Sequence, residues 1–359
     1  MSALNEQLIL NALKHVVDPD LHRDIVSLGF IKDLEIKNHA VSFKVELTTP
    51  ACPVKEKMKQ QSMDAVLSIP DVETVDITMT SRVSGGNKQE LLPNVLNIFA
   101  VASGKGGVGK STTAVNIALA LAETGAKVGL LDADIYGPSL PRMLNMVEKP
   151  LLEQENNEKI VPVEVYGIKA MSMGFFLEED TPMVWRGPMV GKAVEQLLGD
   201  VEWGHLDYLV VDLPPGTGDA QLSLTQKVHM TGAVIVSTPQ DVALADVKKG
   251  ISMFKTVNVP ILGVIENMSF YICSDCGHRA EIFSHGGARR EAQKSDIKFL
   301  GEIPLDEKIR SDSDAGTPVM ISSPTSQQAG YYREIAGSIA AQISIIRHRS
   351  DVFPKIVVQ

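Results

Sequence analysis

The feature that most constrains this chain is the segment GKGGVGKS at residues 104–111. It matches the pattern G-x-x-x-x-G-K-[S/T], follows the apolar run NIFAVAS and precedes the helix-forming segment STTAVNIALALAETG. Glycines let backbone N–H groups converge on phosphate oxygens, and the N-terminus of the following helix adds a favourable dipole. The segment therefore predicts a nucleotide-binding loop between a buried strand and a helix that stops at Gly125.

Each part of this loop has an expected task with ATP. Lys110 should reach the β- and γ-phosphates, and the Ser111 hydroxyl should help to hold Mg²⁺. The whole predicted nucleotide-binding set of the loop is Gly104, Lys105, Gly106, Gly107, Val108, Gly109, Lys110, Ser111 and Thr112.

Carboxylates at the ends of two further apolar runs are candidate partners of the metal and of the attacking water. Asp212 ends the run in YLVVDLPPGTGD and is the expected Mg²⁺ partner, through water. Asp219, at the end of that turn, is either a switch residue or a plain helix N-cap. Asp132 and Asp134 in LLDADIYGPS should reach the same sheet edge, and Asp134, the nearer to the loop, is preferred for the water.

The loop carries a second lysine, Lys105. It is either an ordinary surface lysine or a residue that a second, facing subunit inserts against its neighbour's phosphates. In the second case it would supply the transition-state charge that an arginine finger supplies elsewhere.

The apolar pattern predicts two regions of different architecture. Residues 1–82 read as a small α/β domain, with a strand-like alternation in VSFKVELTT, and residues 83–94 read as a linker. Residues 95–350 carry short apolar runs between helical segments, typical of a doubly wound, mostly parallel sheet. Residues 351–359 are expected to be a tail.

The last helical segment of the large region has Ile335, Ile339, Ile343 and Ile346 at helical spacing. We expect this helix to dock on the sheet, because its polar face lacks the basic residues of a membrane-surface helix.

Composition excludes several classes of partner. A net charge of -10 argues against a general nucleic-acid binder, since phosphate backbones are held by clustered Lys and Arg. The apolar runs are far shorter than the roughly 20 residues that a membrane span needs, and the N-terminal segment does not resemble a signal peptide. We therefore expect a cytoplasmic protein without a membrane partner.

The chain has three cysteines, and two of them form the pair Cys273 and Cys276 in YICSDCGHRAEIF. A C-x-x-C-G turn aims two thiolates at one ion but cannot complete a four-ligand site. Either His278, His285 or Cys52 adds ligands for zinc, or two copies of the chain together present four cysteines to a [4Fe–4S] cluster. Cys52 itself is either an accessory thiol for iron–sulfur material or a partly buried structural thiol.

Together these motifs resemble a known group of proteins. GKGGVGKS resembles the deviant Walker A loop of the nitrogenase iron protein, MinD and ParA group, whose members sandwich nucleotide between two subunits and whose signature lysine matches Lys105. Within that group, LLDADIYGPS, VVDLPPGTGD, IENMS and the C-x-x-C pair resemble Mrp/ApbC-type iron–sulfur cluster carriers over residues 95–345. Residues 1–80, with VVDPDLHRDIVSLGFI and TTPACPVKEKM, resemble the small iron–sulfur assembly domain that precedes such ATPases.

The resemblance implies a homodimeric ATPase that binds a [4Fe–4S] cluster between two subunits, receives it from cluster donors and passes it to apo-proteins. It also implies adenine contacts by Asn267 and by the segment around Pro304. One departure is IFSHGGARREA, where a more glycine-rich run is expected, so Ser284 and His285 are unusual and His285 is expected to be a solvated loop residue.

Two other functions stay open on the residues alone. One is a MinD/ParA-like spatial regulator with a structural zinc, which would need a basic surface or a membrane helix. The other is a small-substrate kinase or an amide-forming synthetase, which would need a substrate-pocket motif.

Overall fold

The structure is a computed structural model that describes residues 4–85, 91–147, 150–152, 159–176, 187–218, 221, 225 and 228–352. The chain divides into two compact units. The small unit comprises residues 1–84 together with 340–359, and the large unit comprises residues 85–339.

The small unit contains a three-stranded sheet in the order β3-β4-β5. Its β3 and β4 are antiparallel, whereas β4 and β5 are parallel and are joined by a helical crossover through α2. The side chains of β4 alternate between buried and more exposed positions, as the sequence pattern predicts for a half-buried strand. The elements are α1 (Glu6–Leu13), β1 (Val17–Asp18), β2 (Arg23–Asp24), β3 (Ile31–Lys37), β4 (Ala40–Leu47), α2 (Lys55–Leu67) and β5 (Thr74–Ser81).

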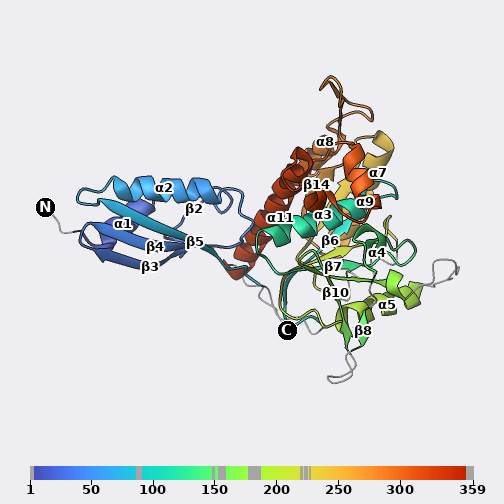
Figure 1. The fold of residues 1–359 in the computed structure, drawn as a ribbon, viewed down its shortest axis with the longest axis horizontal. Coiled ribbons are helices and arrows are strands. Elements are labelled where there is room, and N and C mark those ends of the chain that lie inside the picture. Colours follow the sequence, from blue (N-terminus) through green and yellow to red (C-terminus); the bar gives the residue numbers. More distant parts are fainter. Residues whose placement is uncertain are drawn as a thin grey trace. The chain divides into compact units, whose positions relative to one another are not determined.

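An eight-stranded sheet in the order β10-β11-β7-β12-β6-β13-β14-β17 forms the centre of the large unit, with helices along it (Figure 1). Its strands are β6 (Val95–Ala102), β7 (Val128–Asp132), β10 (Val163–Val165), β11 (Ile168–Ser172), β12 (Leu206–Asp212), β13 (Gly232–Ser237), β14 (Ile261–Glu266) and β17 (Phe299–Glu302). Neighbouring strands of this sheet are parallel, except for β10 and β11. The predicted doubly wound, mostly parallel sheet preceded by a small α/β unit is therefore confirmed.

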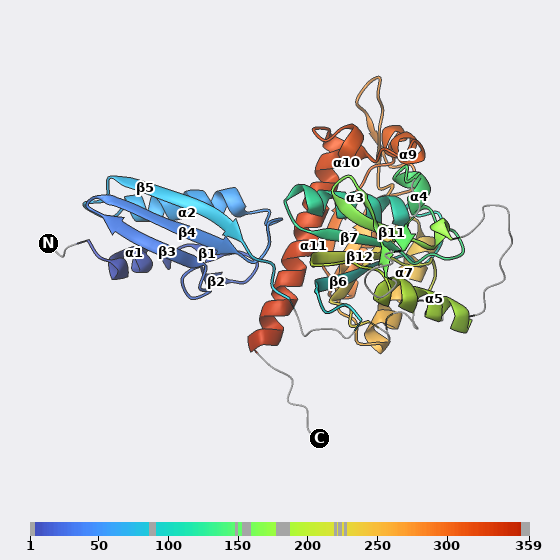
Figure 2. The same cartoon turned by 60° about the horizontal axis from the view of Figure 1, so that its bottom comes forward.

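The remaining elements of the large unit are helices and two short strand pairs that lie outside the eight-stranded sheet (Figure 2). The helices are α3 (Lys110–Glu123), α4 (Leu140–Met143), η1 (Met173–Phe175), α5 (Gly187–Gly199), α7 (Asp241–Thr256), α8 (Gly287–Lys294), α9 (Glu307–Asp314), α10 (Val319–Ser322) and α11 (Gln327–Val352). From residue 340 onward, α11 is assigned to the small unit. Two short hairpins are formed by β8 (Leu151–Leu152) with β9 (Ile160–Val161), and by β15 (Tyr271–Ile272) with β16 (Arg279–Ala280).

The order of the strands decides where the candidate site lies. From β6 the chain crosses through α3 to β7 on one side, and from β13 it crosses through α7 to β14 on the other. Right-handed crossovers in opposite directions put their helices on opposite faces and leave a crevice at the carboxyl ends of the central strands. The loop that follows β6 opens at this crevice.

The last helix, α11, buries Ile335, Ile339 and Ile343, and Ile335 lies against Gly301 of β17. The predicted docking of this helix agrees with these contacts, although Ile346 is only partly buried. Among the described residues, no helix is both long enough and apolar enough to cross a membrane.

Candidate functional site

The phosphate loop lies directly between β6 and α3. Gly107 and Gly109 have φ angles of +79° and +78°, a left-handed conformation that glycine adopts without the strain of a side chain. A Cβ atom at Gly104 would come within 2.3 Å of the Asp246 side chain on α7. The glycine spacing that is visible in the sequence is thus required by both backbone conformation and close packing.

The loop lysine is paired with the predicted metal carboxylate. Lys110 Nζ lies 2.5 Å from Asp212 Oδ1, and the two side chains are 6% and 0% exposed. The strand register brings Asp212 beside Val101 of β6, just before the loop. The other carboxylate oxygen, Asp212 Oδ2, is buried and has no hydrogen-bond partner among the described residues. Lys110 Nζ also lies 3.3 Å from Ser111 Oγ, and an orphaned carboxylate oxygen in this group fits an Mg²⁺ ion with its water ligands.

The two aspartates after β7 are placed differently from one another. Asp132 is fully buried, and its carboxylate accepts hydrogen bonds from Asp134 N, Ser139 N, Leu140 N and Ser172 Oγ at 3.0–3.2 Å. Burial raises the pKa of the Asp132 carboxyl, and the nearby Asp212 carboxylate adds to the shift. Asp132 therefore braces the segment that follows β7.

Asp134 is only partly buried. Burial raises the pKa of its carboxyl, while the positive charge of Lys110 acts in the opposite direction. The influence of Lys110 and Asp212 on this group indicates that Asp134 belongs to the same charged site. Its predicted role with the attacking water stays a prediction.

Lys105 is half-buried, and no ion pair of its ammonium group occurs within the described part of the chain. The backbone at this position is held by a hydrogen bond from Ser103 Oγ to the Lys105 carbonyl. The turn after Asp212 is tied to the same loop, because Gly216 N donates to the Ser103 carbonyl at 2.9 Å. Asp219, further along that turn, lies outside the described residues.

Asn267 has a contact that its predicted adenine role does not include. Its amide Nδ2 donates to the Val108 carbonyl at 2.8 Å, and a Cβ atom on Gly109 would come within 2.2 Å of it. Asn267 thus braces the phosphate loop from the end of β14. Pro304 is buried just after β17, the neighbouring strand, so the two residues lie at adjacent strand ends.

The cysteine pair sits at the tip of the β15–β16 hairpin. Cys273 N donates to the His278 carbonyl and Gly277 N donates to the Cys273 carbonyl, both at 2.9 Å, which closes the turn. Cys273 is half-buried and Cys276 is exposed. Backbone N–H groups of Cys276 and Asp275, followed by the Cys276 thiol, lower the pKa of the Cys273 thiol. A thiolate stabilised in this way is a ready metal ligand.

The described residues do not complete a metal site around these thiols. Only one group of three or more candidate ligand side chains gathers among them, and it contains neither cysteine. His278 is exposed and contributes its carbonyl to the turn. The hairpin by itself offers two sulfur ligands and open coordination positions.

The expectation that His285 is a solvated loop histidine is wrong. Its ring Nε2 lies 2.8 Å from Glu302 Oε2, and 3.0 Å from Arg279 Nη2 on the cysteine hairpin. The sequence reasoning missed Glu266, Arg279 and Glu302, which with His285 join the hairpin to the sheet. The available signal for Glu266 was a charged residue directly at the end of the apolar run ILGVI.

Cys52 lies in the small unit, in the turn before α2, where it packs against the core of that unit. Burial raises the pKa of its thiol, and the carboxylates of Asp18 and Asp20 act in the same direction. At a given pH, Cys52 therefore has a smaller thiolate fraction than Cys273. Both of its expected roles stay open.

A loop of this geometry, followed by a buried lysine–aspartate pair at the edge of a doubly wound sheet, defines a P-loop NTPase. The chain belongs to the family of NUBPL iron-transfer P-loop NTPases, whose family model matches residues 94–340. A second family model, described as iron-sulfur cluster assembly protein, matches residues 6–77. Both matches confirm the resemblance that the motifs indicated.

Individual relatives support the same assignment. An iron-sulfur cluster carrier protein of Deinococcus radiodurans is 48% identical over 337 residues, covering 94% of this chain and 95% of the relative. The iron-sulfur cluster carrier protein of Escherichia coli K12 is 48% identical over 291 residues, covering 80% of this chain and 79% of the relative.

Solved structures resemble about two thirds of the chain. A nucleotide-binding protein from Archaeoglobus fulgidus in complex with ADP matches with a TM-score of 0.57 and 41% identity, over 66% of this chain and 93% of that one. The cell division ATPase MinD of Pyrococcus furiosus matches with a TM-score of 0.51 over 68% of this chain and 98% of that one. At 22% identity, the second likeness shows the fold alone.

Proposed function

We propose that this protein is a homodimeric, ATP-hydrolysing carrier that binds a [4Fe–4S] cluster between two subunits and transfers it to apo-proteins. The observation that carries the proposal is the two-thiol hairpin: Cys276 is exposed, Cys273 is half-buried, and no other ligand among the described residues completes the pair. The names of the relatives, which describe cluster carriers, support the cargo.

In the proposed nucleotide site, the backbone from Gly104 to Thr112 wraps the phosphates. Lys110 carries positive charge against the β- and γ-phosphates. Ser111 would bind Mg²⁺, and Asp212 would contact the ion through its water ligands. Asp134 orients the attacking water, and Asp132 keeps the segment behind it in place through its four hydrogen bonds.

The adenine is proposed to lie at the ends of β14 and β17, near Asn267 and Pro304. The Asn267 amide nitrogen donates one of its two N–H groups to the Val108 carbonyl, so its second N–H group and its side-chain oxygen are left to face the base. The same side chain then contacts the phosphate loop and the base at once.

Lys105 is proposed to act on the neighbouring subunit. A half-buried ammonium group without an ion pair among the described residues is free to meet the phosphates of a facing copy. There it stabilises the charge that develops in the transition state, and this places both active sites at one two-fold interface.

The same two-fold axis brings two cysteine hairpins together. Cys273 and Cys276 from each subunit give four thiolates, the ligand number of a [4Fe–4S] cluster. ATP binding closes the dimer, and loss of the γ-phosphate releases the turn after Asp212, so the nucleotide controls how tightly the cluster is held. Asp219 is proposed as the switch residue of that turn. Cys52 is proposed as an accessory thiol.

Anaerobic reconstitution with iron and sulfide tests the proposal. We expect about four iron and four sulfide per dimer, with a charge-transfer band in the visible spectrum. Cys273→Ala should lose both, whereas the matched control Cys52→Ala should keep them. Zinc at about one per chain with no such band would instead support a structural metal and a spatial-regulator function.

A further inference from the structure

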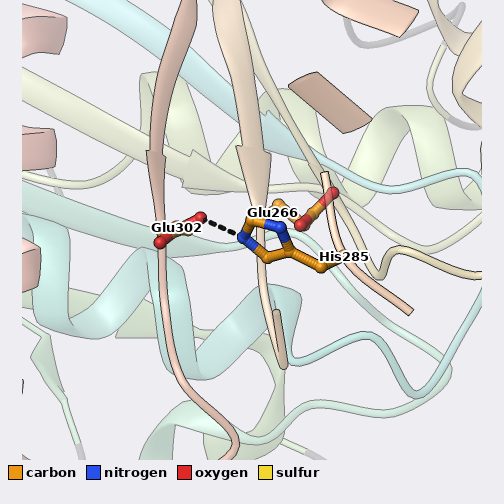
Figure 3. Close-up of side chains that lie close together, drawn as sticks. All are labelled: Glu266, His285 and Glu302. Atoms are coloured by element: carbon orange, nitrogen blue, oxygen red, sulfur yellow. Dashed lines mark hydrogen bonds and ion pairs between the residues drawn. The ribbon is translucent and has the colours of Figure 1, made fainter. Parts of the chain in front are cut away.

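A cluster of charged side chains lies at the root of the cysteine hairpin. Arg279, the first residue of β16, places Nη2 3.1 Å from Glu302 Oε1 and 3.0 Å from His285 Nε2. His285 Nε2 lies 2.8 Å from Glu302 Oε2, and Figure 3 shows this ring between the carboxylates of Glu302 and Glu266. Glu302 ends β17, so the cluster connects the hairpin to the edge of the sheet.

The spacing of Glu266, His285 and Glu302 would suit a metal ion, since their ligand atoms lie within 4.8 Å of one another. Their existing partners argue against it. Glu266 Oε1 accepts hydrogen bonds from Gly286 N and Ser269 Oγ, and Oε2 accepts one from Ala288 N. The Arg279 guanidinium already supplies the positive charge beside Glu302. The cluster is therefore a set of structural bonds around an arginine.

Glu266 also connects the hairpin to the nucleotide site. Its carboxylate holds Gly286 and Ala288, where the chain returns from the hairpin and begins α8. The next residue, Asn267, holds the Val108 carbonyl of the phosphate loop. Two adjacent residues at the end of β14 thus hold the phosphate loop on one side and the hairpin return on the other.

The outgoing side of the hairpin is fixed through the same arginine. The Arg279 guanidinium carbon lies 3.7 Å from the centroid of the Phe270 ring, just before β15. Phe270 is 2% exposed and packs edge-on against Tyr331 of α11. A cation–π contact on a buried ring adds to the ion pair with Glu302, so both strands of the hairpin are anchored.

We propose that Arg279, Glu302 and His285 are positioning residues that fix the cysteine hairpin to the end of β14 and thereby couple the thiols to the phosphate loop. The proposed carrier function supplies the purpose of this coupling, and the inference rests on it in that respect. The coupling itself concerns only this chain and needs no cluster.

Hydrogen–deuterium exchange of the full-length, cluster-free protein tests this inference, with and without a non-hydrolysable ATP analogue. In the wild type, the analogue should slow amide exchange in residues 271–286. Arg279→Ala should speed exchange there roughly threefold to tenfold, as expected for loss of partly exposed charge contacts and a cation–π contact. It should also abolish the response to the analogue, while affinity for the analogue stays within about twofold.

Three further variants make the result specific. Glu302→Gln keeps the shape of the side chain and should speed exchange as Arg279→Ala does. Arg279→Lys keeps the positive charge and should retain part of the slow wild-type exchange. Arg310→Ala, which removes an exposed arginine paired with Asp314 on α9, should change nothing in the hairpin. A hairpin that exchanges at the wild-type rate in Arg279→Ala and Glu302→Gln would overturn the inference, as would a nucleotide response that survives in both.

The two proposals fail separately. Reconstituted protein that binds no iron would refute the carrier function while leaving the exchange result intact. Unchanged exchange would refute the positioning role even in a protein that binds a full cluster.

Discussion

The phosphate loop and the cysteine hairpin lie in the same unit and differ in how completely one chain builds them. The loop is enclosed: Gly104 packs on α7, Asn267 braces it from β14, and Lys110 is paired with a buried aspartate. The hairpin has an exposed tip with two thiols, and its contacts with the sheet are at its root. A nucleotide site can be assembled within one chain, whereas the proposed four-sulfur site needs a second copy, because the chain has three cysteines.

The largest expected effect concerns Lys105, because there the enclosed nucleotide site is itself proposed to need a second subunit. Lys105→Ala should lower ATP turnover at least about 100-fold, as expected for loss of a transition-state charge, and leave ATP affinity within a few-fold. Lys110→Ala should lose nucleotide binding, and hence turnover, in its own subunit. Steady-state hydrolysis and nucleotide titration measure both effects.

Mixing the two inactive variants separates action within a subunit from action between subunits. A mixed dimer pairs the intact Lys110 of one chain with the intact Lys105 of the other, giving one working site. Equal amounts should therefore recover roughly a quarter of wild-type turnover, since half of the dimers are mixed and each has one site of two. A mixture that stays inactive would mean that Lys105 acts within its own chain.

Stability offers the next test, because a buried brace and an exposed tip should respond differently. Asp132→Ala removes the acceptor of three backbone N–H groups and one hydroxyl, so it should lower the free energy of unfolding by about 2–4 kcal/mol. Cys276→Ser at the hairpin tip should leave it unchanged. Asp134→Ala is the matched control, with a small loss of stability and a large loss of turnover. Urea unfolding of cluster-free protein compares the three variants.

The smallest expected effect is a difference in the pH dependence of alkylation between the thiols of the two units. Because hydrogen bonds lower the pKa of Cys273 and burial raises that of Cys52, Cys273 should hold more thiolate at any pH below both values. Its alkylation rate should reach half of its maximum at a lower pH than that of Cys52. Mass spectrometry of each cysteine in cluster-free protein gives the two profiles. Coincident profiles would show that the turn does not stabilise the Cys273 thiolate.

Much of the nucleotide site could be predicted because its parts are local in sequence. The glycine pattern of the loop predicts its backbone conformation, and the apolar runs before Asp212 and Asp132 place both residues at strand ends. The difference between Asp132 and Asp134 could not be predicted, since it depends on which of them meets Ser139, Leu140 and Ser172.

The network around the hairpin could not be predicted either, because its residues are far apart in the sequence. Glu266, Arg279, His285 and Glu302 are separated by up to 36 residues and lie on four different segments, so no local spacing connects them. A histidine in a polar stretch looks solvated until the neighbouring strand is placed beside it.

The sequence by itself determined the chemistry of this protein: a loop whose glycines permit one backbone conformation, and two thiols spaced for one ion. Local conformation and residue type suffice for both. Only the tertiary structure decided which carboxylate faces the site and how the hairpin is anchored, because hydrogen bonds and ion pairs between distant strands exist only once the sheet has brought their ends together.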